Sequence, residues 1–289
     1  MICRLISLLM PALALFAWAV PSRAYIGGTP VPPNGLPSVV TFDLISCTAV
    51  KVGPRQFLMA AHYIQPARDL TVAHAGDPLR ILSHTLTGPA ARTVGRAQLR
   101  SDSTRIRAVV IHPTYQKGIA SAPEASEILT RPGLIDLALL EVDNDTPAIA
   151  AEPLRTTPLV ANEPILMGGY GALNAASRPR FQLRAAWKRV APGSPGAPGN
   201  ATLHYATDLD ADGKSHSMGW EGDSGGPVHA VGPGNRLVVA GINSYVMGVI
   251  WLRADGTLED PRDAGTTHFV RLDHPSARAW LRQLGLISN

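Results

Sequence analysis

A serine in a glycine-rich turn is the residue of this sequence whose surroundings most clearly suit chemistry. Residues 222–228 read Gly-Asp-Ser-Gly-Gly-Pro-Val, with Ser224 in third place. A hydroxyl is a poor nucleophile at neutral pH, so it needs a neighbouring base and N–H donors for the oxyanion that its attack creates. Such a turn can also be only a tight bend, so this interpretation depends on a base elsewhere in the chain.

Two further segments offer that base and a carboxylate to orient it. Leu58-Met-Ala-Ala-His62 places a histidine at the end of an apolar run, and Leu134-Ile-Asp136 places an acid among apolar neighbours. Taken singly, His62 would be an ordinary core histidine and Asp136 a turn residue. Taken with Ser224, the three provide a nucleophile, a base and a group that holds the base in one tautomer.

The chain order His62, Asp136, Ser224 resembles that of the chymotrypsin-like (trypsin-like) serine peptidases, and we identify the chain as similar to a secreted member of bacterial type. Other segments extend the resemblance along most of the chain. They are Tyr25-Ile-Gly-Gly, Ile111-His-Pro-Thr-Tyr115, Gly169-Tyr-Gly171, Gly241 to Val246 and His268 to Leu281.

The resemblance implies an all-β fold of two six-stranded antiparallel β-barrels with the active site in the cleft between them. We expect the barrels at residues 25–155 and 156–289, joined through a proline-rich stretch, with a short C-terminal helix that begins near Pro275. The 27 Gly and 25 Pro residues agree with frequent turns and exclude a helical bundle or coiled coil. Apolar runs of strand length are expected at 38–42, 56–61, 107–111, 135–142, 164–167, 236–242 and 268–272.

The resemblance also implies the catalytic roles. His62 would accept the proton of Ser224, Asp136 would orient the imidazole, and the N–H groups of Gly222 and Ser224 would form the oxyanion hole. Protein or peptide substrates follow from these roles. The alternative is a catalytically silent homologue that binds protein partners.

The first 24 residues read as a signal peptide. Met1–Arg4 is a short basic start, Leu5–Val20 is apolar, and small residues precede a cleavage point after Ala24. This run of 16 residues is shorter than the roughly 20 that span a bilayer, so we expect export to the periplasm or the medium and no permanent membrane anchor. Cleavage there would leave Tyr25 as the new terminus, whose α-amino group would pair with Asp223 as in the family.

A second cleavage point remains open for this leader. A cut after Ala17-Trp18-Ala19 would leave a pro-segment, Val20 to Ala24, that is removed later. Either cut removes Cys3, so the exported chain keeps Cys47 alone and cannot form an internal disulfide. Cys47 matches half of a family disulfide, but the usual partner position holds Tyr63.

The specificity pocket implied by the resemblance is formed by Met218, Ser244, Tyr245, Val246 and Thr267. Met218 stands at the base, where trypsin-type relatives have Asp, so Lys and Arg side chains would not be attracted. Val246 and Thr267 are larger than the glycines of trypsin-type pockets. We therefore expect cleavage after small or medium apolar residues.

No strong signal points to a cofactor or to another class of partner. Asp208, Asp210 and Asp212 have the spacing of the first half of a calcium loop, but the twelfth position is Gly219, so a solvated acidic turn is favoured over calcium. The formal net charge of +4 comes without any run of basic residues, which argues against nucleic-acid binding. We expect a monomer.

Overall fold

The computed structural model describes Ile26 and residues 28–84, 91–94, 97–129, 131, 133–172, 182–191, 204–207, 217–247 and 266–288. The expected signal peptide, Tyr25 and the acidic residues Asp208, Asp210 and Asp212 lie outside these described residues.

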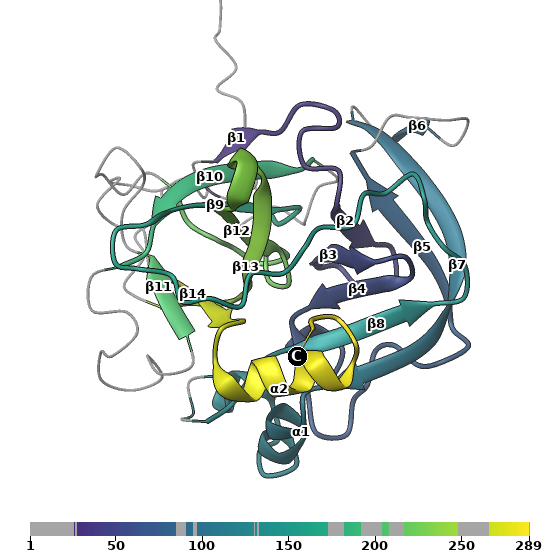
Figure 1. Cartoon of the computed structure of the whole chain (residues 1–289). Coiled ribbons are helices and arrows are strands. Elements are labelled where there is room, and N and C mark those ends of the chain that lie inside the picture. Colours follow the sequence, from purple (N-terminus) through teal and green to yellow (C-terminus); the bar gives the residue numbers. More distant parts are fainter. Residues whose placement is uncertain are drawn as a thin grey trace, which may run out of the picture.

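The first half of the chain forms a closed barrel (Figure 1). Its strands are β2 (Val39–Phe42), β3 (Thr48–Gly53), β4 (Gln56–Met59), β5 (Pro78–Ser83), β6 (Ala91–Val94), β7 (Ala97–Ile111) and β8 (Ala138–Val142). The order is β5-β2-β3-β4-β8-β7-β6, and an additional pairing of β5 with β7 closes six strands into a ring. The remaining strand, β6, extends the sheet as a hairpin with β7.

The long β7 makes this closure possible. Residues 100–105 pair antiparallel with β5, and Ile106 to Ile111 pair antiparallel with β8. A register shift between Ile106 and Ala108 marks the change of partner, as expected where a bulge bends a strand. The barrel interior is filled by buried apolar side chains, among them Phe42 and Phe57, whose rings meet edge to face.

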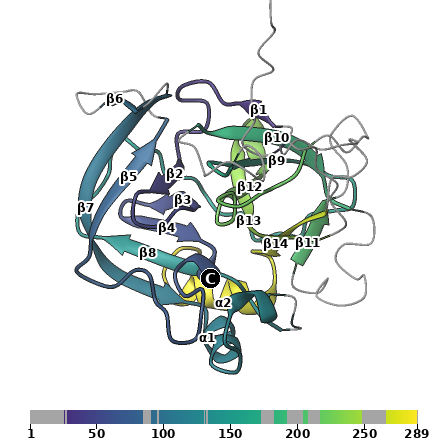
Figure 2. The ribbon, with the colours of Figure 1, turned by 180° about the vertical axis from the view of Figure 1, so that it is seen from behind.

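The second half of the chain, joined by β1 from near the start of the chain, forms another antiparallel sheet, seen beside the barrel in Figures 1 and 2. Its order is β1-β10-β9-β12-β13-β14-β11, and no strand pairing within the described residues closes it. The strands are β1 (Thr29–Pro30), β9 (Pro164–Gly169), β10 (Arg184–Arg189), β11 (His204–Thr207), β12 (Pro227–Val231), β13 (Leu237–Met247) and β14 (Thr266–Arg271). The expected all-β fold class is thereby confirmed.

An apolar core joins the two sheets. Leu58 and Leu139 from the barrel pack in one cluster with Val239 and Ile242 from the second sheet. The helix α2 (Pro275–Gln283) adds Trp280 to the same cluster and lies where the two sheets meet (yellow in Figure 1). The expected C-terminal helix is thus present, and its buried stripe ties the chain end to both halves.

A second helix, α1 (Pro113–Ile119), was not expected from the sequence. Pro113 occupies its first turn, and His112 caps it by accepting a hydrogen bond from the Thr114 N–H. Tyr115 and Ile119, four positions apart, are both buried against the barrel core. Two apolar positions over two turns are too short a pattern to predict from sequence, so packing on the barrel explains this helix.

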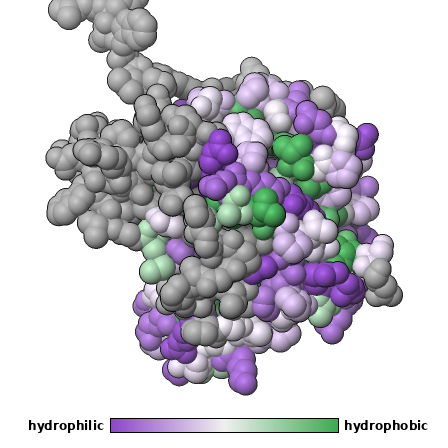
Figure 3. All heavy atoms as spheres, turned by 60° about the vertical axis from the view of Figure 1, so that its left-hand side comes forward, coloured by the Kyte–Doolittle hydropathy of each residue, from purple (hydrophilic) through white to green (hydrophobic). Residues whose placement is uncertain are grey.

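Three single turns of 3-10 helix complete the described elements, η1 (Ala61–Tyr63), η2 (Ala125–Glu127) and η4 (Pro233–Asn235). On the face shown in Figure 3, the coloured surface is mostly hydrophilic and its hydrophobic side chains stand in small separate groups. Within the described part of the chain, no helix has the length and apolarity needed to cross a membrane.

Candidate active site

His62 forms two hydrogen bonds with one carboxylate, one through its backbone and one through its imidazole. β4 is buried along Phe57–Met59, and the chain then turns into η1, which places His62 at the barrel edge. Its backbone N–H donates to Asp136 Oδ1 at 2.9 Å, and its Nδ1 lies 2.7 Å from Asp136 Oδ2. Because an ionised carboxylate only accepts, Nδ1 carries the proton and Nε2 is left to accept one.

Asp136 is completely buried in the segment that leads into β8, with 0% of its side chain exposed. Besides the two bonds from His62, its Oδ2 accepts the hydroxyl proton of Ser244 at 2.6 Å. Burial by itself would raise the pKa of Asp136, but the His62 charge and the hydrogen bonds from His62 and Ser244 hold that pKa below its ordinary value. The carboxylate is therefore ionised at neutral pH.

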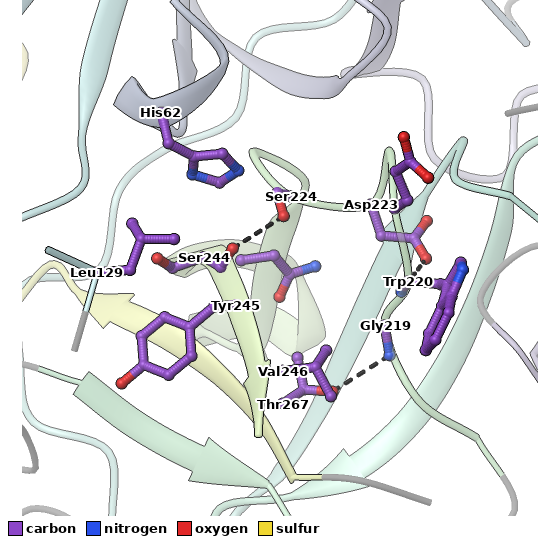
Figure 4. A pocket seen from close by; sticks show the side chains of 12 residues that line it. His62, Leu129, Gly219, Trp220, Asp223, Ser224, Ser244, Tyr245, Val246 and Thr267 are labelled. Atoms are coloured by element: carbon purple, nitrogen blue, oxygen red, sulfur yellow. Dashed lines mark hydrogen bonds between the residues drawn. The ribbon is translucent and has the colours of Figure 1, made fainter. Parts of the chain in front are cut away.

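Ser224 lies in the tight turn that precedes β12. Gly225 follows it with φ of +85°, and a Cβ there would stand 2.2 Å from the carbonyl oxygen of Thr48, so the turn requires glycine at this position. The hydroxyl of Ser224 donates to the carbonyl oxygen of Ser244 at 2.8 Å, as the dashed line in Figure 4 shows. Among the described residues, the structure gives no hydrogen bond between Ser224 and His62, although both line one pocket.

The N–H group of Gly222, a predicted oxyanion donor, already donates a hydrogen bond within the protein. Gly222 has φ of +91°, its carbonyl accepts from the Thr48 hydroxyl at 2.8 Å, and its N–H donates to the phenol oxygen of Tyr63, also at 2.8 Å. The Tyr63 ring packs beside His62 with the ring centres 4.6 Å apart. Burial is the main cause that raises the pKa of Tyr63, so its hydroxyl stays protonated.

Asp223 is buried behind the turn. Its Oδ1 accepts from the Gly171 N–H at 2.8 Å, and its Oδ2 accepts from the Trp220 N–H at 2.9 Å. A Cβ at Gly169 or Gly171 would lie 2.2 Å or 2.5 Å from this side chain, which explains the glycines of the Gly-Tyr-Gly motif. The expected partner, the Tyr25 α-amino group, lies outside the described residues.

A pocket of about 340 Å³ opens beside these groups (Figure 4). It is lined by His62, Leu129, Gly219, Trp220, Glu221, Asp223, Ser224, Asn243, Ser244, Tyr245, Val246 and Thr267. The lining includes the predicted pocket residues on β13 and β14. Met218 is not part of the lining, because it is fully buried and its N–H donates to the carbonyl oxygen of Ile26 at 2.9 Å.

The pocket narrows between the segment before Ser224 and the strands β13 and β14. The Gly219 N–H donates to the Thr267 hydroxyl at 3.2 Å. A Cβ at Gly219 would lie 3.4 Å from Thr267 Cγ2 and 3.7 Å from Val246 Cγ2, so both side chains reach the glycine. Val246 and Thr267, the two walls of the pocket, therefore restrict the space for a substrate side chain.

Several features of the site were not predicted. They include the hydroxyl bond from Ser244 to Asp136, the phenol of Tyr63 at Gly222, and the presence of Trp220, Glu221 and Asn243 in the pocket lining. Leu129, which follows η2, also reaches the pocket, from the first half of the chain. Only the tyrosine in a family cysteine position gave a sequence signal, because the others depend on side chains that meet across the fold.

Candidate ligands for a metal ion do not gather in the described part of the structure, where no group of three or more His, Cys, Asp or Glu side chains has a suitable arrangement. Cys47 is buried, and its sulfur forms no disulfide. Burial raises the pKa of the Cys47 thiol well above its ordinary value, which is the behaviour of an inert core cysteine.

Comparisons with known proteins agree with this geometry. Among solved structures, the chain is similar to human heparin binding protein at 17% identity with a TM-score of 0.59, covering 91% of this chain and 98% of that chain. A mutant of human heparin binding protein (CAP37) matches with the same coverage, at 17% identity and a TM-score of 0.62. An atomic-resolution structure of HBP also matches with this coverage, at 16% identity and a TM-score of 0.60. At these identities the likeness concerns the fold.

The sequence itself gives the family. No curated protein matches it. The family model described as Trypsin, however, matches residues 25–250, which is most of the chain and includes His62, Asp136 and Ser224. The protein therefore belongs to the trypsin family.

Proposed function

We propose that the protein is an exported serine endopeptidase that cleaves peptide bonds through an acyl-enzyme intermediate. The observation that carries this proposal is the pair of hydrogen bonds from His62 to the buried carboxylate of Asp136, in a pocket that Ser224 also lines. An imidazole held in the tautomer that accepts a proton at Nε2 is what a general base beside a serine requires.

In the proposed reaction, His62 accepts a proton from the nucleophile and then donates it to the leaving group. Ser224 Oγ attacks the substrate carbonyl carbon while its proton passes to His62 Nε2, and the charge of Asp136 stabilises the imidazolium. His62 then gives that proton to the leaving amine as the peptide bond breaks. Water, deprotonated by the same nitrogen, attacks the acyl carbon; the ester bond to Ser224 then breaks, the acyl group leaves as a carboxylic acid, and His62 returns the proton to Ser224 Oγ.

Two contacts favour the second candidate, a silent homologue that binds protein partners. The Ser224 hydroxyl donates to Ser244 instead of His62, and the Gly222 N–H donates to Tyr63. For attack, the Ser224 hydroxyl would have to leave the Ser244 carbonyl and turn toward His62, which a change between staggered χ1 rotamers would allow. We favour the enzyme because catalytic hydrogen bonds often align only when substrate is bound.

Covalent labelling separates the two candidates. A fluorophosphonate probe reacts only with an activated serine, so the exported protein is expected to gain one adduct, at Ser224. The Ser224→Ala variant is the matched control and is expected to stay unlabelled. A folded wild-type protein that takes up no probe would support the silent homologue instead.

Tyr63 is expected to slow the proposed reaction. The Gly222 N–H has a single proton, so the phenol oxygen that accepts it competes with the oxyanion of the substrate. Tyr63→Phe keeps the ring beside His62 and removes the competitor. One hydrogen bond contributes about 0.5–1.5 kcal/mol, so kcat/KM is expected to rise about 2- to 10-fold.

Steady-state kinetics of Tyr63→Phe, corrected by active-site titration, measures this effect. Removal of a true oxyanion donor costs about 10²- to 10³-fold. A fall of that size would mean that the Tyr63 hydroxyl itself donates to the oxyanion, and the competition argument would be wrong.

The narrow pocket supports a preference for small or medium apolar side chains over Lys and Arg. Val246 and Thr267 both reach Gly219, which shortens the space beside Ser224. Met218 is uncharged and buried, so no carboxylate at that position would attract a cation. Protein or peptide substrates, a monomeric state, no cofactor, and no binding of nucleic acid or membrane remain part of the proposal.

We propose that cleavage of the leader during export also activates the enzyme. If the leader is cut after Ala24, the new α-amino group of Tyr25 is available to Asp223, whose carboxylate is already buried behind the catalytic turn. The bridge between Ile26 and Met218 supports this position for the chain start. Mass spectrometry of the exported protein is expected to show Tyr25 as first residue, whereas a chain that begins at Val20 would contradict direct activation.

A further inference from the structure

A buried amide in the pocket has no role in the proposed reaction. Asn243 on β13 is 2% exposed and lines the pocket beside Ser224. Neither its amide nitrogen nor its amide oxygen has a hydrogen-bond partner among the described residues. Buried polar side chains in folded proteins nearly always have partners, so a group left unpaired at a ligand pocket points to the ligand as its partner.

The backbone holds this amide in place. The Asn243 N–H donates to the carbonyl of Gly226 at 2.9 Å, and the Asn243 carbonyl accepts from the Gly225 N–H at 2.8 Å. These bonds tie the residue to the turn that carries Ser224. The pairing of β13 with β14 shifts register between Asn243 and Tyr245, and such irregularities re-aim side chains near active sites.

The chemistry of the amide selects among side chains. A carboxamide has a donor and an acceptor side by side, so its best partner is another carboxamide, which satisfies both in a pair of parallel hydrogen bonds. An aliphatic side chain would leave both atoms of Asn243 unpaired, and an ammonium or carboxylate group would satisfy one. The walls at Val246 and Thr267 limit the size of whatever enters.

We propose that Asn243 is a specificity-determining residue that selects a carboxamide side chain, asparagine first and glutamine second, at the residue whose carbonyl Ser224 attacks. The inference rests on the proposed peptidase function. It keeps the size limit set by Val246 and Thr267 and replaces the apolar preference by a preference for a carboxamide of similar size.

Matched peptide substrates that differ only at this residue test the inference. Asparagine and leucine have nearly the same shape, so their ratio of kcat/KM isolates the hydrogen bonds. We expect the wild-type enzyme to prefer asparagine over leucine by at least about 10-fold, because a site built to hydrogen-bond a substrate rejects the analogue that lacks the group. The Asn243→Leu variant is expected to lose this preference and to cleave the leucine substrate faster than the asparagine substrate.

An alanine substrate and fluorophosphonate titration are the controls. Alanine offers no group to the amide, so the kcat/KM of each substrate is divided by that of the alanine substrate, and the ratio for asparagine is expected to fall in Asn243→Leu. If that variant does not fold, Asn243→Ser, which is shorter and still polar, is expected to lose the asparagine preference as well. Equal cleavage of asparagine and leucine by a labelled wild-type enzyme would overturn this inference alone, whereas no labelling would overturn the peptidase function and this inference with it.

Discussion

Replacing Ser224 by Ala is expected to lower kcat by about 10⁴- to 10⁶-fold, the largest effect of any single substitution in this chain. The methyl group leaves no nucleophile for the carbonyl carbon, while the imidazole of His62 and its bonds to Asp136 stay in place. Residual catalysis would come only from substrate binding and the oxyanion donors. Single-turnover kinetics on purified protein measures the loss.

The Ser224→Ala protein should fold normally. The hydroxyl makes one bond, to the Ser244 carbonyl, and the backbone bond from Thr48 N to the Ser224 carbonyl does not involve the side chain. An unchanged thermal unfolding midpoint is therefore the control. Turnover retained in a purified, folded Ser224→Ala protein would show that another residue is the nucleophile.

Asp136→Asn is expected to lower kcat by about 10⁴-fold with little change in shape. The carboxylate accepts from the His62 N–H, from His62 Nδ1 and from the Ser244 hydroxyl, and an amide has only one oxygen for these three donors. An amide NH₂ facing Nδ1 makes that nitrogen an acceptor, so the proton moves to Nε2. His62 then cannot take the proton of Ser224.

Asp143→Asn is the matched control for Asp136→Asn, because it changes an exposed acid at the other end of β8. The control should keep wild-type kcat. Equal kcat in all three proteins would refute the orienting role of Asp136, and a loss in both variants would indicate a general effect of removing charge.

Comparison of Asp136→Asn with wild type also checks the electrostatics of the buried carboxylate. Because the folded state holds the pKa of Asp136 below its ordinary value, the ionised group stabilises the fold at pH values above its unfolded pKa of about 3.9. That stabilisation is lost as the pH falls through the lower, folded pKa. Denaturant unfolding of wild type and Asp136→Asn should therefore differ by a constant amount above about pH 5 and converge in more acidic solution.

Tyr63 connects a departure from the family to the reaction. The resemblance places a cysteine there to pair with Cys47, and the structure instead places a phenol that reaches Gly222, 159 residues away in sequence. The family disulfide would be a cross-link within the barrel. The hydrogen bond from the Gly222 N–H to the Tyr63 phenol instead links the barrel to the catalytic turn. Removing it should alter turnover more than folding stability.

Much of the candidate site could be predicted because its residues lie in short motifs of characteristic residue types. Glycine is required at 225 and 171, where a Cβ would meet the Thr48 carbonyl or the Asp223 carboxylate, so a tertiary contact fixes a residue type that can be read in the sequence. The all-β class followed from strand-length apolar runs between turn residues. The helix α1 was missed because its two buried positions form no readable period.

The sequence by itself determined the fold class, the order of His62, Asp136 and Ser224, and the tyrosine at position 63 where the resemblance implies a cysteine, since each is a matter of residue type and spacing. Only the tertiary structure decided where polar atoms find partners. The Ser224 hydroxyl turns to Ser244, the Gly222 N–H turns to Tyr63, and the amide of Asn243 faces a pocket without a partner among the described residues. Hydrogen bonds are short and directional, so they depend on how segments far apart in the chain pack, and no local pattern records that.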